Sequence, residues 1–191
     1  MIVGLARGGA GLSMKPLPAA IAFVLASWAC GMAYELTLTM DGTGLGGNHP
    51  DTRSSFILAQ GDYVLIALAA LTMARRWHLD FRGLFWVAMG KSLTEGLIFT
   101  GVLTVALMTG QLGLAALTLP YYTLAYASFV ALPLLLIAPE SLWRPAPVKT
   151  PPIFTLILTG FAVAFVIRLI WGFGWAPFAT WAFDLPPNPV P

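Results

Sequence analysis

Charged residues are scarce in this sequence. Lys, Arg, Asp and Glu make up 9% of its 191 residues, whereas 58% are hydrophobic. A soluble domain carries about 25% charged residues, because its surface must stay wet. The shortage argues against a soluble globular domain, and a net charge of +2 is too small to indicate a nucleic-acid partner. We therefore expect the chain to have a lipid bilayer around it.

Cysteine and histidine are also rare. The single cysteine, Cys30, cannot form an internal disulfide, which excludes a membrane disulfide oxidoreductase. The two histidines, His49 and His78, fall between apolar runs, whereas a cytochrome b holds haem with histidines inside its helices. No H-E-x-x-H motif, P-loop or G-x-S-x-G elbow occurs. The sequence therefore predicts no metal and no cofactor.

Five apolar runs are long enough to cross a bilayer. A helix needs about 20 apolar residues to span roughly 30 Å of hydrocarbon, and its backbone polar groups must be satisfied within the segment. The runs are Leu17–Leu38, Phe56–Met73, Gly83–Met108, Leu114–Ile137 and Ile153–Trp175. We therefore predict an all-α fold, a polytopic integral membrane helix bundle with about five transmembrane helices.

Two short end segments are predicted to flank the bundle, which covers residues 17–175. Residues 1–16 would be cytoplasmic, and residues 176–191, with four prolines near their end, would form an extended tail. Alternatively, residues 14–33 are a cleaved signal peptide, because Lys15 precedes the first run and Gly31-Met32-Ala33 suits signal peptidase. Cleavage would leave four transmembrane helices.

The basic residues gather on alternate connections between the runs. Only Arg53 lies in a connection on the other side. Seven lie before the first run, between the second and third runs, or between the fourth and fifth runs: Arg7, Lys15, Arg75, Arg76, Arg82, Arg144 and Lys149. Cytoplasmic loops carry the excess of Lys and Arg. We therefore expect a multi-pass protein of a bacterial inner membrane, with a cytoplasmic N-terminus and the C-terminus outside.

Ionisable residues inside the runs are the candidates for function. Each costs roughly 2.5–3.5 kcal/mol at mid-membrane, so it should face the bundle interior or water and find a partner. They are Glu35, Asp62, Lys91, Glu95 and Arg168. Lys91 and Glu95 are one helical turn apart and are predicted to pair along their helix. Asp62 and Arg168 would form a second pair.

The same residues predict a polar pocket that faces outward. At about 1.5 Å per residue, Asp62 and Arg168 fall in the outer half of the membrane, with Glu95 near its middle. Polar residues on the second and fourth runs complete the candidate set: Gln60, Tyr122 and Tyr126. Three acids face two bases, which leaves one spare titratable carboxyl. We therefore expect solute binding or proton-coupled transport, with Glu95 at the floor of the pocket.

Helix packing alone can also explain these charges, because bundle interiors use polar pairs to hold helices together. Two small-xxx-small pairs, Ser27/Gly31 and Gly160/Ala164, favour close helix contacts in either case. Under this alternative the chain is an accessory or assembly subunit, and other membrane subunits are its partners.

A third alternative is a membrane-embedded enzyme. Tyr34-Glu35 in the first run and Asp62 in the second resemble the paired acids of membrane-bound terpene cyclases. The resemblance covers these two runs alone, and it implies a lipid or isoprenoid substrate. Apart from this resemblance, the sequence indicates no catalytic residue. An enzyme is therefore the less favoured expectation.

Overall fold

Helices make up all the regular structure that is described. The computed structural model describes residues 14–40, 52–142 and 149–186. Every regular element in these ranges is a helix, which confirms the predicted all-α class. Two expectations lie partly outside the described residues: the N-terminal segment 1–16 and the extended tail 176–191.

Four helical stretches of the described chain are long and apolar enough to cross a membrane. The first two are α2 (Pro16–Met40) and α3 (Thr52–Trp77). The third joins α6 (Leu112–Ala131) to α7 (Pro133–Leu136), and a single 3₁₀ turn, η2 (Pro139–Ser141), follows it. The fourth runs from α8 (Ile153–Ile170) through the π-helix η3 (Trp171–Trp175) into α9 (Ala176–Ala182). These helices are compatible with a multi-pass membrane protein.

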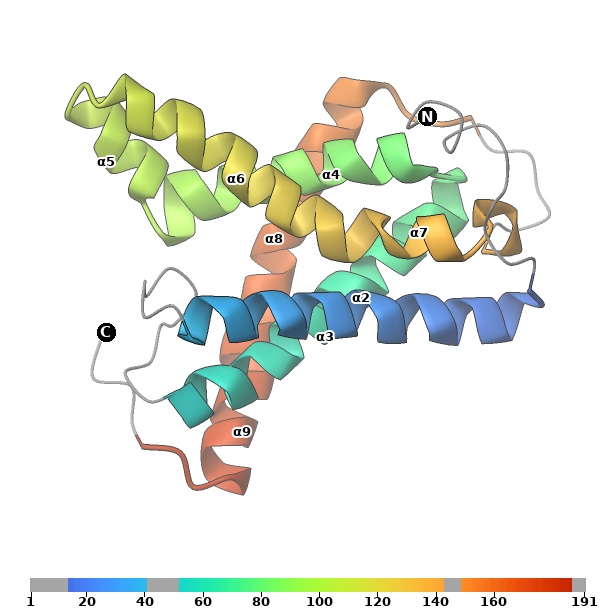
Figure 1. The fold of residues 1–191 in the computed structure, drawn as a ribbon, viewed down its shortest axis with the longest axis horizontal. Helices are drawn as coiled ribbons and strands as arrows, with labels where there is room; N and C mark the ends of the chain where they lie inside the picture. The colour runs from blue at the N-terminus through green and yellow to red at the C-terminus, as the bar shows by residue number, and fades with distance from the viewer. Residues whose placement is uncertain (1–13, 41–51, 143–148, 187–191) are drawn as a thin grey trace.

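The predicted span Gly83–Met108 is bent. It consists of α4 (Phe81–Thr94), the π-helix η1 (Glu95–Phe99) and α5 (Val102–Met108), with a bend of 67° after η1. The predicted span is therefore a bent pair of helical segments, and it counts as a fifth span if the pair crosses the bilayer once. Gly101 at the bend has a φ of 67°, which glycine adopts without steric strain. Both α4 and α5 pack against α6, so the bent segment follows that helix along its length (Figure 1).

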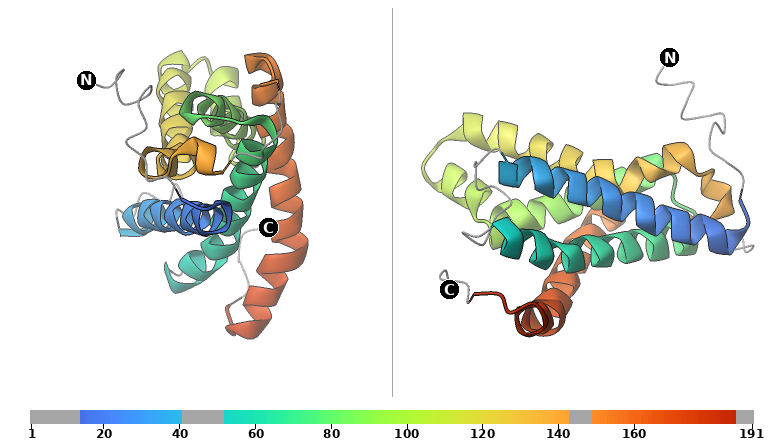
Figure 2. Two further views of the ribbon diagram at one scale, coloured as in Figure 1. Left: turned by 90° about the vertical axis from the view of Figure 1, so that its right-hand side faces the viewer. Right: turned by 60° about the horizontal axis from the view of Figure 1, so that its bottom comes forward.

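The helices pack against one another in pairs, and α8 runs across several of them. The most extensive packing joins α4 to α8, α4 to α6, and α2 to α3. In two views α8 crosses α2 and α6 at a steep angle (Figures 1 and 2). The core between them holds the fully buried Phe23, Leu84 and Phe129.

Glycines allow α4 and α8 to approach closely. A Cβ atom on Gly90 would lie 1.9 Å from the Ile157 carbonyl oxygen, and one on Gly160 would lie 2.0 Å from the Val87 carbonyl oxygen. No side chain fits at such distances, so only glycine permits this crossing. Ala164, one turn after Gly160, is 2% exposed. The predicted close contact through Gly160 and Ala164 is confirmed.

The fifth predicted span is longer than expected. Residues 176–182 were predicted to be extended, but they form α9. Pro177 lies at the start of that helix, directly after the π-helix η3, and has no N–H group to donate. The indole N–H groups of Trp171 and Trp175 both donate to the Leu58 carbonyl of α3, at 2.9 and 3.0 Å, and hold this extension in place.

Candidate functional site

An ion pair lies inside the bundle where α4 becomes η1. Lys91 Nζ and Glu95 Oε1 are 2.7 Å apart, and their side chains are 7% and 11% exposed. Both belong to one helix, one turn apart, so the predicted pairing is confirmed. Lys91 Nζ also lies 3.8 Å from the centroid of the Tyr126 ring on α6. The Tyr126 hydroxyl interacts with the Glu95 carboxylate, so one tyrosine contacts both charges.

Glu95 is the first residue of the π-helix. The Thr100 amide and hydroxyl both donate to the Glu95 carbonyl, at 2.8 and 2.9 Å, which closes the wide turn. Tyr122 on α6 interacts with Thr100 through its hydroxyl and with the Glu95 charge. Single π-turns occur often at functional sites. The Glu95 carboxylate and the bend of this span therefore share one short segment.

Glu35 is buried and forms a contact with α3. The Tyr63 hydroxyl donates to Glu35 Oε2 at 2.9 Å, and Glu35 is 4% exposed. A Cβ atom on Gly31, one turn before Glu35, would lie 2.4 Å from the Tyr63 ring. Gly31 therefore lets the Tyr63 ring lie flat enough against α2 to reach the carboxylate. Glu35 lies within α2, which continues to Met40.

Aromatic rings connect the two carboxylates. Three tyrosine rings pack around the buried Phe129 of α6, with centroids 5.1 to 6.1 Å from its ring: Tyr34, Tyr63 and Tyr126. Tyr63 contacts Glu35, and Tyr126 contacts Glu95. At the edge of the group, the Tyr34 and Tyr121 hydroxyls are 3.2 Å apart, and Tyr121 is 41% exposed.

Asp62 and Arg168 come close without forming the predicted ion pair. Asp62 is half-buried and interacts electrostatically with Lys91, Glu95 and Arg168. In the described part of the chain, however, no carboxylate lies within 4.0 Å of the Arg168 guanidinium. The guanidinium carbon instead lies 5.1 Å from the ring centroids of Phe99 and Trp171.

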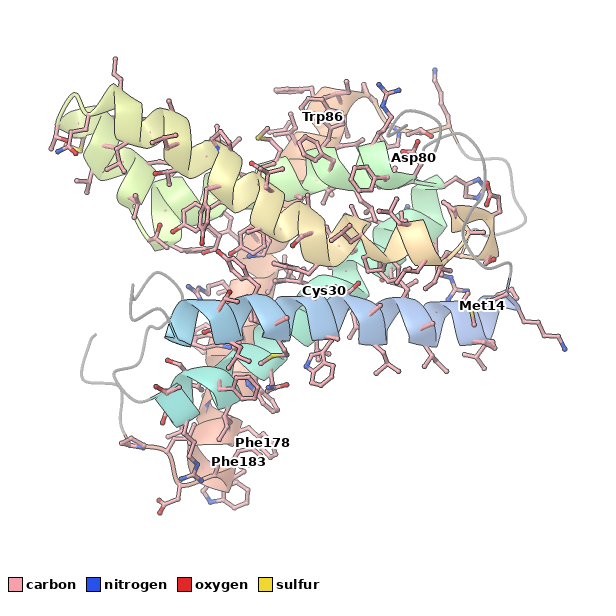
Figure 3. All side chains as sticks on the ribbon, in the orientation of Figure 1. Met14, Cys30, Asp80, Trp86, Phe178 and Phe183 are labelled. Carbon is pink, nitrogen blue, oxygen red and sulfur yellow. The ribbon has the colours of Figure 1, made fainter. Side chains whose placement is uncertain are left out.

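Gln60 lies away from this cluster. Its Oε1 accepts from the Trp28 indole at 2.8 Å, and its Nε2 donates to the Phe56 carbonyl at 3.3 Å. It lines a groove of about 380 Å³ with apolar neighbours from α3 and the α8–α9 stretch: Gly61, Val64, Leu65, Ile170, Gly174, Trp175 and Phe178. Figure 3 shows Phe178 on α9, at the far end of the molecule from Asp80.

The cavity beside the ion pair is small. It has a volume of about 20 Å³ and is lined by apolar residues together with Lys91 and Tyr126. A space of that size holds one water molecule. A solute pocket with Glu95 as its floor would therefore require the helices to move apart.

Sequence analysis missed Tyr63, Phe99 and Thr100. Tyr63 was overlooked because its neighbour Asp62 carried the charge. The Thr100-Gly101 dipeptide, in the middle of an unusually long apolar run, was a signal for the bend. No signal could have indicated Phe99, because apolar residues surround it in the sequence.

Comparisons with protein-family models, curated proteins and solved structures find no significant match to this chain. Its function must therefore be inferred from the cluster itself.

Proposed function

We propose that this chain is a proton-coupled membrane transport protein, with Glu95 as its proton-accepting carboxylate. The observation that carries the proposal is the buried Lys91–Glu95 pair at the first residue of a π-turn, inside a bent apolar span. In several secondary transporters, interrupted membrane helices form the site for substrate and coupling ion.

The charges around Glu95 support a role in proton transfer. Lys91 on the same helix, Asp62 on α3, Arg168 on α8 and Tyr126 on α6 all interact with its carboxylate or its partners. A proton that binds Glu95 neutralises the carboxylate and leaves Lys91 without its ion-pair partner. That change favours a rearrangement of η1, because an unpaired buried charge is costly. The rearrangement would open the single-water cavity toward a solute.

We further propose that α4, η1 and α5 together make one crossing. The N-terminus then lies on the cytoplasmic side of a bacterial inner membrane and the C-terminus outside. The basic residues support this orientation, because seven of them lie before α2, beside the α3–α4 connection, or in the segment before α8.

The test uses purified protein in liposomes that contain a pH-sensitive dye. Candidate solutes are added outside one at a time, as organic acids, amino acids and phosphate. The informative variant carries both Lys91→Met and Glu95→Gln, because removing both charges leaves neither unpaired in the bundle. We expect it to melt within a few degrees of the wild type while losing solute-dependent acidification of the lumen.

Glu140→Gln is the matched control, since Glu140 is an exposed carboxylate in the 3₁₀ turn η2. It should acidify the lumen as the wild type does. The proposal fails if no solute acidifies the lumen of wild-type liposomes, or if the double variant acidifies it at the wild-type rate.

An accessory subunit is the second candidate. The α5–α6 hairpin extends beyond the other helices (Figure 1) and exposes large apolar side chains, among them Met108 at 83% and Leu117 at 74%. This surface would suit another membrane subunit. Purification in mild detergent, followed by mass spectrometry, should then recover a fixed partner that Met108→Ser and Leu117→Ser release.

A further inference from the structure

Arg168 has no acceptor for its N–H groups in the described part of the chain. It lies in the most apolar of the four long helical stretches, and it is half-buried there. A guanidinium group carries five N–H donors in a planar fork. An arginine at membrane depth normally pairs with a carboxylate or with backbone carbonyls, so this site has donors to spare.

Two aromatic rings hold the guanidinium in position. Phe99, the last residue of η1, and Trp171 of η3 both lie 5.1 Å from its central carbon. Trp171 is itself fixed by its hydrogen bond to the Leu58 carbonyl. Cation–π contacts use the face of the guanidinium and leave the N–H edge available for hydrogen bonds.

Asp62 stands near enough to compensate part of the charge but does not occupy the N–H groups. The Asp62 carboxylate interacts with Arg168 electrostatically. The two side chains form no ion pair among the described residues, so the carboxylate lies more than 4.0 Å from the guanidinium nitrogens. A planar fork of free donors matches an oxyanion, which a guanidinium binds through two parallel hydrogen bonds.

We propose that Arg168 binds an oxyanion, the carboxylate or phosphate group of a ligand, between Phe99 and Trp171. The assignment rests on the proposed function, because it names an anion as the class of solute. Phe99 and Glu95 are the two ends of η1. Anion binding at one end and protonation at the other would therefore act on the same five-residue turn.

The experiment measures the melting temperature of the purified protein against concentration of benzoate, inorganic phosphate, or phosphatidylglycerol in mixed micelles with phosphatidylcholine. At least one of them should raise the melting temperature of the wild type. Arg168→Gln should weaken the apparent affinity at least tenfold. Arg168→Lys should weaken it several-fold, because an ammonium keeps the charge but lacks the fork. Arg82→Gln, which removes an exposed arginine at the start of α4, should change nothing.

A response to benzoate or phosphate identifies a soluble anion, and a response to phosphatidylglycerol alone identifies a lipid headgroup. Either supports the site if it depends on Arg168. Equal affinities in the wild type and Arg168→Lys, or no response to any probe, would overturn it, and the lysine variant decides where Arg168→Gln does not fold. The Lys91→Met/Glu95→Gln variant should still bind the anion, so loss of proton coupling and loss of this site can be told apart.

Discussion

Tyr63 and Glu35 show how one glycine sets a polar contact between two helices. Gly31 on α2 leaves room for the ring of Tyr63 on α3. The Tyr63 hydroxyl then reaches the Glu35 carboxylate, 2.9 Å away. Tyr63 is 6% exposed, so this hydrogen bond forms away from solvent. A hydrogen bond in such a place contributes more than the same bond at the surface, because water does not replace it when it is lost.

Removing the Tyr63 hydroxyl should therefore destabilise the protein. We expect Tyr63→Phe to lower the free energy of unfolding by about 1–3 kcal/mol, the range for a hydrogen bond to a charged or buried group. Tyr121→Phe is the matched control, since its hydroxyl bonds to Tyr34 at an exposed position. It should cost less than about 0.5 kcal/mol. Denaturant titration in mild detergent measures both, and equal losses would show that the Tyr63–Glu35 bond has no special weight.

At the level of elements, the crossing of α4 and α8 rests on two backbone approaches that no side chain could replace. Gly90 faces Ile157, and Gly160 faces Val87. Thr94, one turn after Gly90, donates to the Phe161 carbonyl at 3.3 Å across the same crossing. The crossing fixes α8, and with it Arg168, relative to the Lys91–Glu95 pair. Packing here therefore determines the geometry of the candidate site.

Adding one methyl group at this crossing should force the helices apart. Gly90→Ala and Gly160→Ala should each destabilise the protein by about 1–3 kcal/mol or more, because overpacking requires backbone shifts. Gly113→Ala on α6 has no atom within 4 Å of the added Cβ, so it should be neutral or slightly stabilising. Thermal melting of the three variants separates these outcomes. Equal melting temperatures would mean that α4 and α8 are further apart than described.

The sequence predicted contacts within one helix better than contacts between helices. The Lys91–Glu95 pair followed from a spacing of four residues, which fixes the distance in any α-helix. The expected Asp62–Arg168 pair depended on how α3 and α8 are rotated about their axes, and apolar runs do not define that rotation. The bend at Gly101 was missed for a related reason, since the hydrophobic pattern continues through it. Length and hydropathy specify where helices occur, and packing specifies which faces meet.

For the whole molecule, several helix ends lie toward two opposite ends of the structure, and α8 crosses between them (Figure 1). The beginning of α2, next to Met14, and the α3–α4 connection, which holds Asp80, lie toward one end (Figure 3). The α5–α6 turn lies at the opposite end (Figure 1). Arg75, Arg76 and Arg82 flank the α3–α4 connection. The connection flanked by these three arginines therefore lies at the end that the proposed topology places on the cytoplasmic side.

The bent span decides the topology of the whole chain. If α4, η1 and α5 cross the bilayer once, the α5–α6 turn lies outside and the segment before α8 lies inside. If they enter and return on the cytoplasmic side, the α5–α6 turn lies inside and the segment before α8 lies outside. Gln111, in the turn, and Lys149, before α8, are exposed and suit a labelling test. In a Cys30→Ala background, Gln111→Cys should react with an impermeant thiol reagent in intact cells, whereas Lys149→Cys should react only after the membrane is permeabilised. The reverse pattern, with Gln111→Cys protected and Lys149→Cys reactive in intact cells, would establish a re-entrant segment, with four crossings and both termini on one side.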